Sequence, residues 1–255
     1  GHDNAPVNHV LPAWDISAGL TAAVAILAAE RHRRLTGEGQ YVRLSLVDVA
    51  LAMVGHLGFI AEADHGRSQR RAHGNHLFGA FGRDFATIDG RRIMIVAISP
   101  RQWRNLCEAT GLAEKMALLE QVFEADFDRE GDRFEARDAI ASLIETWCET
   151  RSLVQIAEVF DAAGVCWGRY QSFRQLLDED ARCSVDNPLF ELVEHPGVGE
   201  YLMPGSTLDF GAAPRVSMQA ATQMGQHTDE VLSEILGLGD AEIGRLHDSR
   251  IVAAA

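Results

Sequence analysis

The chain has 255 residues, of which 47% are hydrophobic and 24% charged, ordinary values for a soluble globular protein with a substantial core. Its net charge of −14 argues against nucleic acid and anionic membrane as general partners. No apolar run is expected to reach the length needed to span a bilayer, and no signal peptide is visible. The four cysteines lack metal-ligand spacing, so reduced thiols in a cytoplasmic protein are expected.

The first predicted element is a long helix that opens at Asp15. Aspartate caps helices because its carboxylate accepts hydrogen bonds from the free N–H groups of the first turn. Apolar residues recur at helical spacing from Ile16 onward, arginines up to Arg34 fill the last turn, and Gly37 supplies a stop. The stretch 40–46 then alternates apolar and polar residues, which predicts a strand.

A second helix is predicted to begin after Ser45. Ser45 and Asp48 fit the looser form of a capping box, and apolar residues continue to about Glu62. Gly55 and Gly58 are weak points within this helix or places where another element approaches closely.

Beyond a charged linker at 64–73, strand and helix patterns mix. Two strand-like stretches, 85–88 and 92–98, flank Asp89-Gly90, a strong hairpin signal. Helices are predicted at 100–110, 113–123, 132–149, 152–163, 173–177, 228–236 and 240–246. A short strand or turn is predicted at 164–169, and a strand pair within 188–210.

The order of motifs in the first part of the chain resembles that of the family III CoA-transferases. An aspartate precedes a helix rich in small residues, and an R-x-x-TG-x-GQ-x-V strand leads to L-x-D-x-x-L. The pieces are Asp15, Arg33, Thr36, Gly37, Gly39, Gln40, Val42, Leu46, Asp48 and Leu51. Each piece alone is uninformative, but their combined order and spacing is fairly specific. The resemblance continues to the C-terminus.

The resemblance implies an α/β fold built from the C-terminal portion of such an enzyme. Residues 1–65 are expected to form a large-domain segment with the Asp helix, 66–170 a small α+β domain, and 171–255 a linker and return segment to the large domain. Members of the family have an N-terminal α/β half before the Asp helix, and nothing here corresponds to it. The chain is therefore expected to be part of an enzyme, or a subunit that needs a partner.

Asp15 matches the catalytic nucleophile of the family by position. Without the resemblance, an aspartate at a helix start is an ordinary N-cap. With it, the carboxylate is expected to attack an acyl-CoA thioester, expel the CoA thiolate and form a mixed anhydride. The helix N-terminus would favour the ionised carboxylate and stabilise developing charge.

A glycine-spaced segment follows the linker and supplies the candidate substrate-binding and CoA-binding residues: Gly74, Asn75, Gly79, Gly82 and Arg83. It resembles the flexible glycine-rich loop that covers the intermediate in the family, and glycines let a backbone approach a ligand closely. The alternative is a plain turn before a strand. Arg83 is suited to a substrate carboxylate, or it forms an ion pair with the adjacent Asp84.

The activity implied is CoA transfer between carboxylates, with intramolecular transfer on a branched C4 dicarboxylate as the sharpest form. Intermolecular transfer, an alpha-methylacyl-CoA racemase and an inactive fragment or partner subunit are the alternatives. Ser99 stands where the racemases have an acidic residue, and it cannot serve as that base. No cofactor is expected beyond the coenzyme A of the substrate, and His73-x-x-His76 lacks a third metal ligand, so both are expected at the surface. The expected partners are an acyl-CoA and either a second copy or the missing half.

Overall fold

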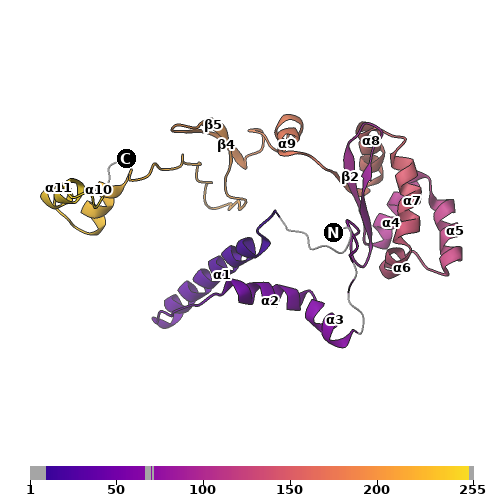
Figure 1. Cartoon of the computed structure of the whole chain (residues 1–255), viewed down its shortest axis with the longest axis horizontal. Coiled ribbons are helices and arrows are strands. Elements are labelled where there is room, and N and C mark those ends of the chain that lie inside the picture. The colour runs from indigo at the N-terminus through magenta and orange to yellow at the C-terminus, as the bar shows by residue number, and fades with distance from the viewer. Residues whose placement is uncertain (1–9, 67–69, 71, 253–255) are drawn as a thin grey trace. The chain divides into compact units, whose positions relative to one another are not determined.

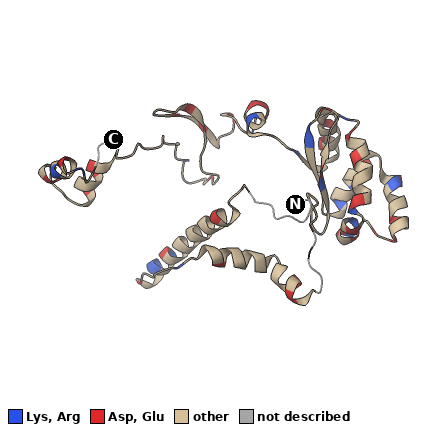
Figure 2. Cartoon of the chain, viewed as in Figure 1, with Lys and Arg blue, Asp and Glu red and all other residues tan. Residues whose placement is uncertain are grey.

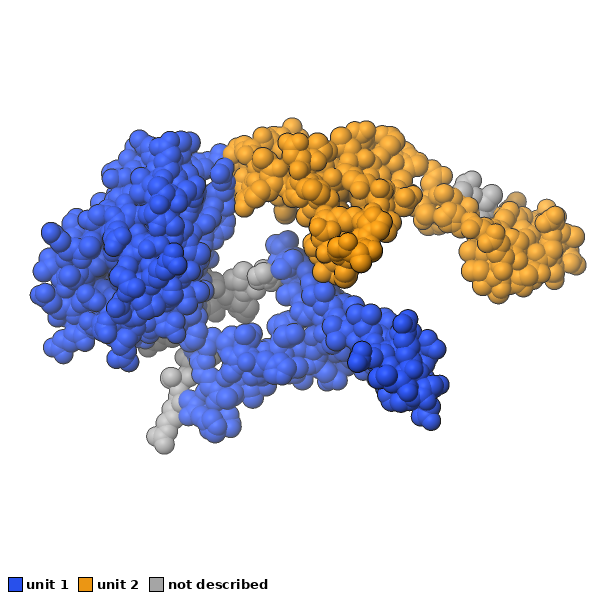
Figure 3. All heavy atoms as spheres, turned by 180° about the vertical axis from the view of Figure 1, so that it is seen from behind, with its two compact units in different colours: residues 1–170 blue, residues 171–255 orange. Residues whose placement is uncertain are grey.

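The computed structural model describes residues 10–66, 70 and 72–252 (Figure 1). The chain forms two compact units, residues 1–170 and 171–255 (Figure 3). Helices and antiparallel strands are both present, which confirms the predicted mixture of helix and sheet. The three-part division into 1–65, 66–170 and 171–255 stays a prediction.

Helix α1 spans Ala13–Thr36 and begins two residues before Asp15. Pro12 occupies the N-cap position, and no side chain within the described part of the chain caps the helix. The prediction that Asp15 is the N-cap is therefore wrong: the helical backbone begins at Ala13, directly after Pro12, so Asp15 lies within the first turn. The helix ends as predicted at Gly37, which has a left-handed φ of 82° and whose N–H donates to the Arg33 carbonyl at 2.8 Å.

No residue of α1 is buried in the structure. The helix is 24 residues long, and its length and apolar composition are sufficient to cross a membrane. The helices α2 (Leu46–His56) and α3 (Phe59–His65), which are bent by 64° relative to each other, are together also long and apolar enough. The sequence-based statement that no run is long enough is therefore wrong. Length and composition are weak evidence for a span, because core helices of soluble proteins have the same properties.

The predicted second helix begins where expected, directly after Ser45, but it is divided at Gly58 into two helices. The Ser45 hydroxyl caps α2 by accepting the Asp48 N–H at 3.4 Å. Gly58 takes a φ of 80°, which a continuous right-handed helix excludes, and α3 begins after it. The predicted strand at 40–46 is not formed, because no strand within the described part of the chain pairs with it.

A three-stranded antiparallel sheet forms the centre of the domain that follows. Its strands β1 (Phe81–Ala86), β2 (Arg92–Ala97) and β3 (Cys166–Arg169) lie in the order β1-β2-β3. The predicted turn is confirmed: Gly90 has a φ of 73° and its N–H donates to the Thr87 carbonyl at 3.1 Å. Strand β1 begins four residues before the predicted strand, because buried Phe81 continues the side of the sheet that faces the core.

Five helices belong to the same domain as this sheet: α4 (Pro100–Thr110), α5 (Ala113–Phe123), α6 (Glu130–Glu135), α7 (Arg137–Cys148) and α8 (Leu153–Ala163). Of these, α5 packs on α4 and α7, and the others pack on the sheet. Capping boxes fix the starts of α4 and α8, at Ser99 and Ser152. The predicted helix 132–149 is divided at Ala136 into α6 and α7. The core contains Phe81, Phe85, Ile93, Ile95, Leu106, Ile140, Ile144, Ile156 and Phe160.

The cysteines of this domain differ in their surroundings, which gives a first prediction. Burial raises the pKa of the Cys107 and Cys148 thiols to about 12, whereas Cys166 is exposed on β3. Because the thiolate is the reactive form, iodoacetamide at mildly alkaline pH should label Cys166 while Cys107 and Cys148 react only after denaturation. Peptide mass spectrometry measures this order, and equally fast labelling of Cys148 in the folded chain would contradict the packing described here.

The second unit contains short elements joined by long connections. They are α9 (Phe173–Glu179), the antiparallel pair β4 (Phe190–His195) and β5 (Gly199–Pro204), α10 (Thr228–Glu230), the π-helical turn η1 (Val231–Ile235) and α11 (Asp240–Asp248). The predicted strand pair is confirmed. His195 is buried, its ring stacks on Tyr201 at 4.3 Å, and its Nδ1 accepts the Ala221 N–H at 3.1 Å.

Candidate active site

Asp15 lies exposed in the first turn of α1. The first turn of an α-helix has N–H groups without intrahelical acceptors, and the aligned peptide dipoles give it a partial positive charge. An exposed carboxylate there is accessible to an electrophilic carbonyl carbon. Among the described residues, no hydrogen bond or ion pair joins Asp15 to the glycine-spaced segment.

The glycines of that segment occupy two different environments. Gly74 and Gly79 have left-handed φ values of 57° and 81° and form turns. Gly82 instead lies inside β1 and is buried. A Cβ at this position would lie 3.0 Å from Leu77 Cβ and 3.1 Å from the Ile95 carbonyl oxygen. The prediction that Gly82 belongs to a flexible loop is therefore wrong, and close packing explains this glycine.

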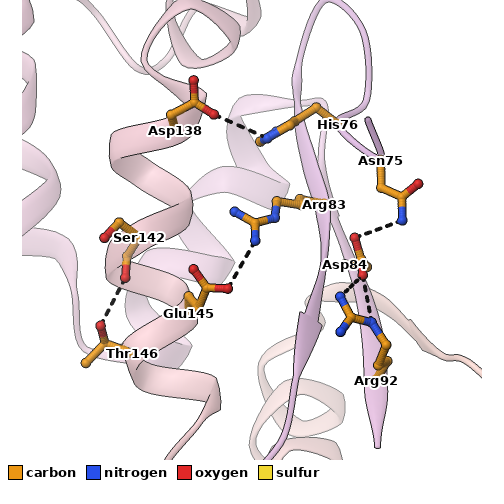
Figure 4. A network of polar contacts seen from close by, with 9 residues as sticks. All are labelled: Asn75, His76, Arg83, Asp84, Arg92, Asp138, Ser142, Glu145 and Thr146. Carbon is orange, nitrogen blue, oxygen red and sulfur yellow. Dashed lines mark hydrogen bonds and ion pairs between the residues drawn. The ribbon is translucent and has the colours of Figure 1, made fainter. Parts of the chain in front are cut away.

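Asn75 is held to the sheet through Asp84 (Figure 4). Its Nδ2 donates to Asp84 Oδ1 at 3.0 Å. The Arg92 guanidinium donates to the other carboxylate oxygen of Asp84, with 2.8 Å between Arg92 Nε and Asp84 Oδ2. Burial acts to raise the pKa of Asp84, but the hydrogen bonds from Arg92 and Asn75 outweigh it and hold the pKa below its usual range. Asp84 is thus a buried anion that fixes the conformation of Asn75.

Arg83 points away from Asp84 and pairs with α7 (Figure 4). Its Nη2 donates to Glu145 Oε1 at 3.0 Å. The predicted ion pair between Arg83 and Asp84 is wrong, because successive residues of a strand point to opposite faces of the sheet. The structure shows that Arg83 already has an acidic partner.

The two histidines are packed side chains, which corrects the expectation that they lie on the surface. His76 Nε2 lies 3.3 Å from Asp138 Oδ1, and its buried Nδ1 has no hydrogen-bond partner among the described residues. His73 contacts Phe78 and Phe134, with ring centroids 5.7 and 5.2 Å away. Burial is the main cause that lowers the pKa of both histidines. Within the ranges 10–66 and 72–252, no group of three His, Cys, Asp or Glu side chains could hold a metal.

Sequence reasoning missed the two carboxylates of α7 that hold this segment. Asp138 and Glu145 are seven residues apart, a spacing that places them on one side of a helix, and this is a detectable signal. Their partners could not be identified, because Glu145 and Arg83 are 62 positions apart in the chain.

The comparisons with known proteins agree on one family. A sequence model of the protein family described as "CoA-transferase family III" matches residues 1–228. A 2-methylfumaryl-CoA isomerase from Chloroflexus aurantiacus is 53% identical over 247 residues, which are 97% of this chain and 60% of the relative. A formyl-CoA:oxalate CoA-transferase from Rhodopseudomonas palustris is 24% identical over 263 residues, or 92% of this chain and 58% of the relative.

The solved structures add support for the fold. A crystal structure of an aspartate-to-alanine mutant of Rv3272 from Mycobacterium tuberculosis aligns with a TM-score of 0.66. The identity is 18%, and the alignment covers 90% of this chain and 57% of that one. Measured against the two sequence relatives named above, the chain spans about 60% of their length. The match over residues 1–228 and the 53% identity together place the chain in CoA-transferase family III.

Proposed function

We propose that this chain supplies the Asp15 part of an enzyme that isomerises 2-methylfumaryl-CoA to 3-methylfumaryl-CoA. CoA would move between the two carboxyl groups of a branched C4 dicarboxylate (mesaconate). The observation that carries the proposal is the 53% identity with a 2-methylfumaryl-CoA isomerase over 97% of the chain. We further propose that the enzyme acts in the cytoplasm and needs no cofactor besides the CoA of its substrate.

The chemistry requires a carboxylate from the enzyme. The two carboxyl groups of the substrate are trans across a double bond, so they cannot close into a cyclic anhydride. In the proposed mechanism, Asp15 attacks the thioester carbon, the C–S bond breaks, and CoA leaves as a thiolate. The thiolate then attacks the Asp15 acyl carbon of the anhydride, which releases the dicarboxylate and leaves CoA on Asp15.

The second half reverses these steps at the other end of the substrate. The other carboxylate attacks the aspartyl thioester, expels the CoA thiolate and forms a new anhydride with Asp15. The thiolate attacks the substrate carbonyl of that anhydride, which yields the isomeric thioester and regenerates the Asp15 carboxylate. Every bond broken in the first half is thus formed again, and no oxidant, reductant or net proton is consumed.

The glycine-spaced segment is proposed to bind the CoA ester through its backbone at Gly74 and Gly79. Asn75 and Arg83 are engaged with Asp84 and Glu145, so they are proposed to maintain the shape of this segment. Gly82 is proposed to support the segment through its close contact with Leu77.

Of the two alternative activities, intermolecular CoA transfer has more support than the racemase. The racemase alternative needs an acid after β2, but Ser99 there caps α4 by accepting the Gln102 N–H at 3.3 Å. Intermolecular transfer is favoured by the 24% identical relative named as a formyl-CoA:oxalate CoA-transferase. It uses the same Asp15 chemistry with a second carboxylate as acceptor.

The test is to incubate 2-methylfumaryl-CoA with the purified chain, alone and with the part of the Chloroflexus relative that lies outside the match. Chromatography should show 3-methylfumaryl-CoA, at a rate that added carboxylic acids do not change. A rate that requires an added acid would establish intermolecular transfer. Exchange of the α-proton of a 2-methylacyl-CoA would establish the racemase. If neither preparation changes any of these substrates, the proposal is wrong.

The exposed surface of α1 leads to a prediction about assembly. A groove of about 430 Å³ lies between α1 and the extended stretch after it. Its lining residues are Ala22, Ala25, Ile26, Ala29, Glu30, Arg33, Gly39, Gln40, Val42 and Leu44. Because large exposed apolar surfaces are usually covered by partners, the chain is expected to associate with a second copy or with a chain that corresponds to the unmatched part of its relatives.

Sedimentation velocity over a concentration series measures this association. Ile26→Asp should weaken it by tenfold or more, because a buried charge without a partner is costly. Leu118→Asp on α5 is the matched control, since Leu118 is similarly exposed but lies elsewhere. A monomer at all concentrations, with or without the chain that corresponds to the unmatched part, would contradict the prediction.

A further inference from the structure

The segment between Gly74 and Ala80 is positioned mainly by its side chains. Within the described part of the chain, it has no helix or strand and two backbone hydrogen bonds. The His76 N–H donates to the His73 carbonyl at 3.1 Å, and the Leu77 N–H donates to the Gly82 carbonyl at 2.8 Å. A segment with so few backbone contacts takes its position from the side chains that tie it to its neighbours.

One tie from this segment and one from β1, the strand that follows it, lead to the same helix. His76 approaches Asp138, and Arg83 donates to Glu145, so α7 holds the chain on both sides of the Gly79 turn (Figure 4). The opposite side of α7 is anchored in the core by Ile140 and Ile144, which are fully buried. The carboxylates therefore project from a fixed support.

We propose that Asp138 and Glu145 are positioning residues that hold the Gly79 turn in the conformation that receives the CoA ester. This rests on the proposed function, because it assumes that the segment contacts the substrate. The two carboxylates act through His76 and Arg83 and do not touch the reacting atoms. Arg83 is then a structural cation whose charge Glu145 compensates, and it is not the anchor for the substrate carboxylate.

The solvent exposure of the two pairs predicts which carboxylate, Asp138 or Glu145, contributes more to holding the segment. The Arg83 and Glu145 side chains are 27% and 39% exposed, whereas Asp138 is 79% exposed beside a His76 that is 14% exposed. Water screens an exposed charge more strongly, so the Glu145 contact is the stronger of the two. Glu145→Gln should consequently disturb the segment more than Asp138→Asn does.

Hydrogen exchange of the 255-residue chain tests the positioning directly. Amides at 76–80 should exchange about three- to tenfold faster in Glu145→Gln, the range that the loss of one contact of this kind produces. Amides within β2 and α8 should keep their rates. The matched control is Glu149→Gln, which removes an exposed carboxylate one turn further along the helix. Unchanged exchange in the double variant Asp138→Asn/Glu145→Gln would overturn the proposal, as would equal acceleration throughout the domain.

Kinetics then separate positioning from a merely structural role. In the preparation that shows Asp15-dependent turnover, Glu145→Gln should raise KM severalfold with kcat nearly unchanged, and Glu145→Asp should restore part of the loss. An unchanged KM would overturn the proposal even if exchange is faster. If the wild-type chain has no turnover at all, the proposed function has failed, and the exchange experiment still decides whether α7 holds the segment.

Discussion

Asp15→Asn is expected to abolish CoA transfer while leaving the fold intact. An amide cannot form the anhydride, and no second route to the product exists because the trans diacid cannot cyclise. Turnover should therefore fall to the detection limit, whereas binding of the CoA ester should persist. Chromatography of the products measures the first effect and isothermal titration the second. Asp240→Asn, at another exposed aspartate in a helical first turn, is the control and should keep full activity.

The stability of this variant checks the position of Asp15 in α1. Because Asp15 is not the N-cap, its replacement removes only an interaction with the helix dipole, about 0.3–1 kcal/mol. Hydroxylamine added during wild-type turnover should convert the Asp15 peptide to a hydroxamate that mass spectrometry detects. Substantial activity in Asp15→Asn, or a hydroxamate on a different carboxylate, would show that the nucleophile is misassigned.

Gly82→Val is expected to destabilise the domain around the sheet by about 1–3 kcal/mol, the usual cost of forcing extra atoms into a packed interior. The first added carbon would meet Leu77 Cβ at 3.0 Å and the Ile95 carbonyl oxygen at 3.1 Å, and the latter belongs to the backbone of β2. Thermal unfolding should shift by roughly 2–4 °C for each kcal/mol. Activity should fall with the folded fraction.

Gly79→Asn is the matched comparison. Gly79 has open space around it and a φ of 81°, a conformation that asparagine tolerates better than most residues. Its stability should fall by about 1 kcal/mol, the lower end of the range for a strained backbone position. Loss of turnover without a larger loss of stability would support a role for Gly79 in substrate binding. A Gly82→Val chain as stable as wild type would show that β1 and Leu77 pack less closely than described.

Local signals in the sequence predicted most helix ends and the hairpin. Ser99 and Ser152 each precede a glutamine three residues later, and both form capping boxes. Asp89-Gly90 forms the expected turn, and Gly37 ends α1. These features succeed because a cap or a turn depends on residues within one helical turn of each other, so neighbouring side chains determine it. The motif order around Asp15 likewise indicated the family.

Only the tertiary structure decided which side chains meet. In the structure Arg83 pairs with Glu145 and not with Asp84, and Gly82 lies in β1 and not in a loop. No strand among the described residues pairs with the alternating stretch 40–46. The structure also showed that α7 supplies Glu145 to Arg83. The physical reason is common to these cases: ion pairs, close backbone contacts and strand pairing join residues far apart in the chain. Local propensity specifies an element but not the element that packs against it.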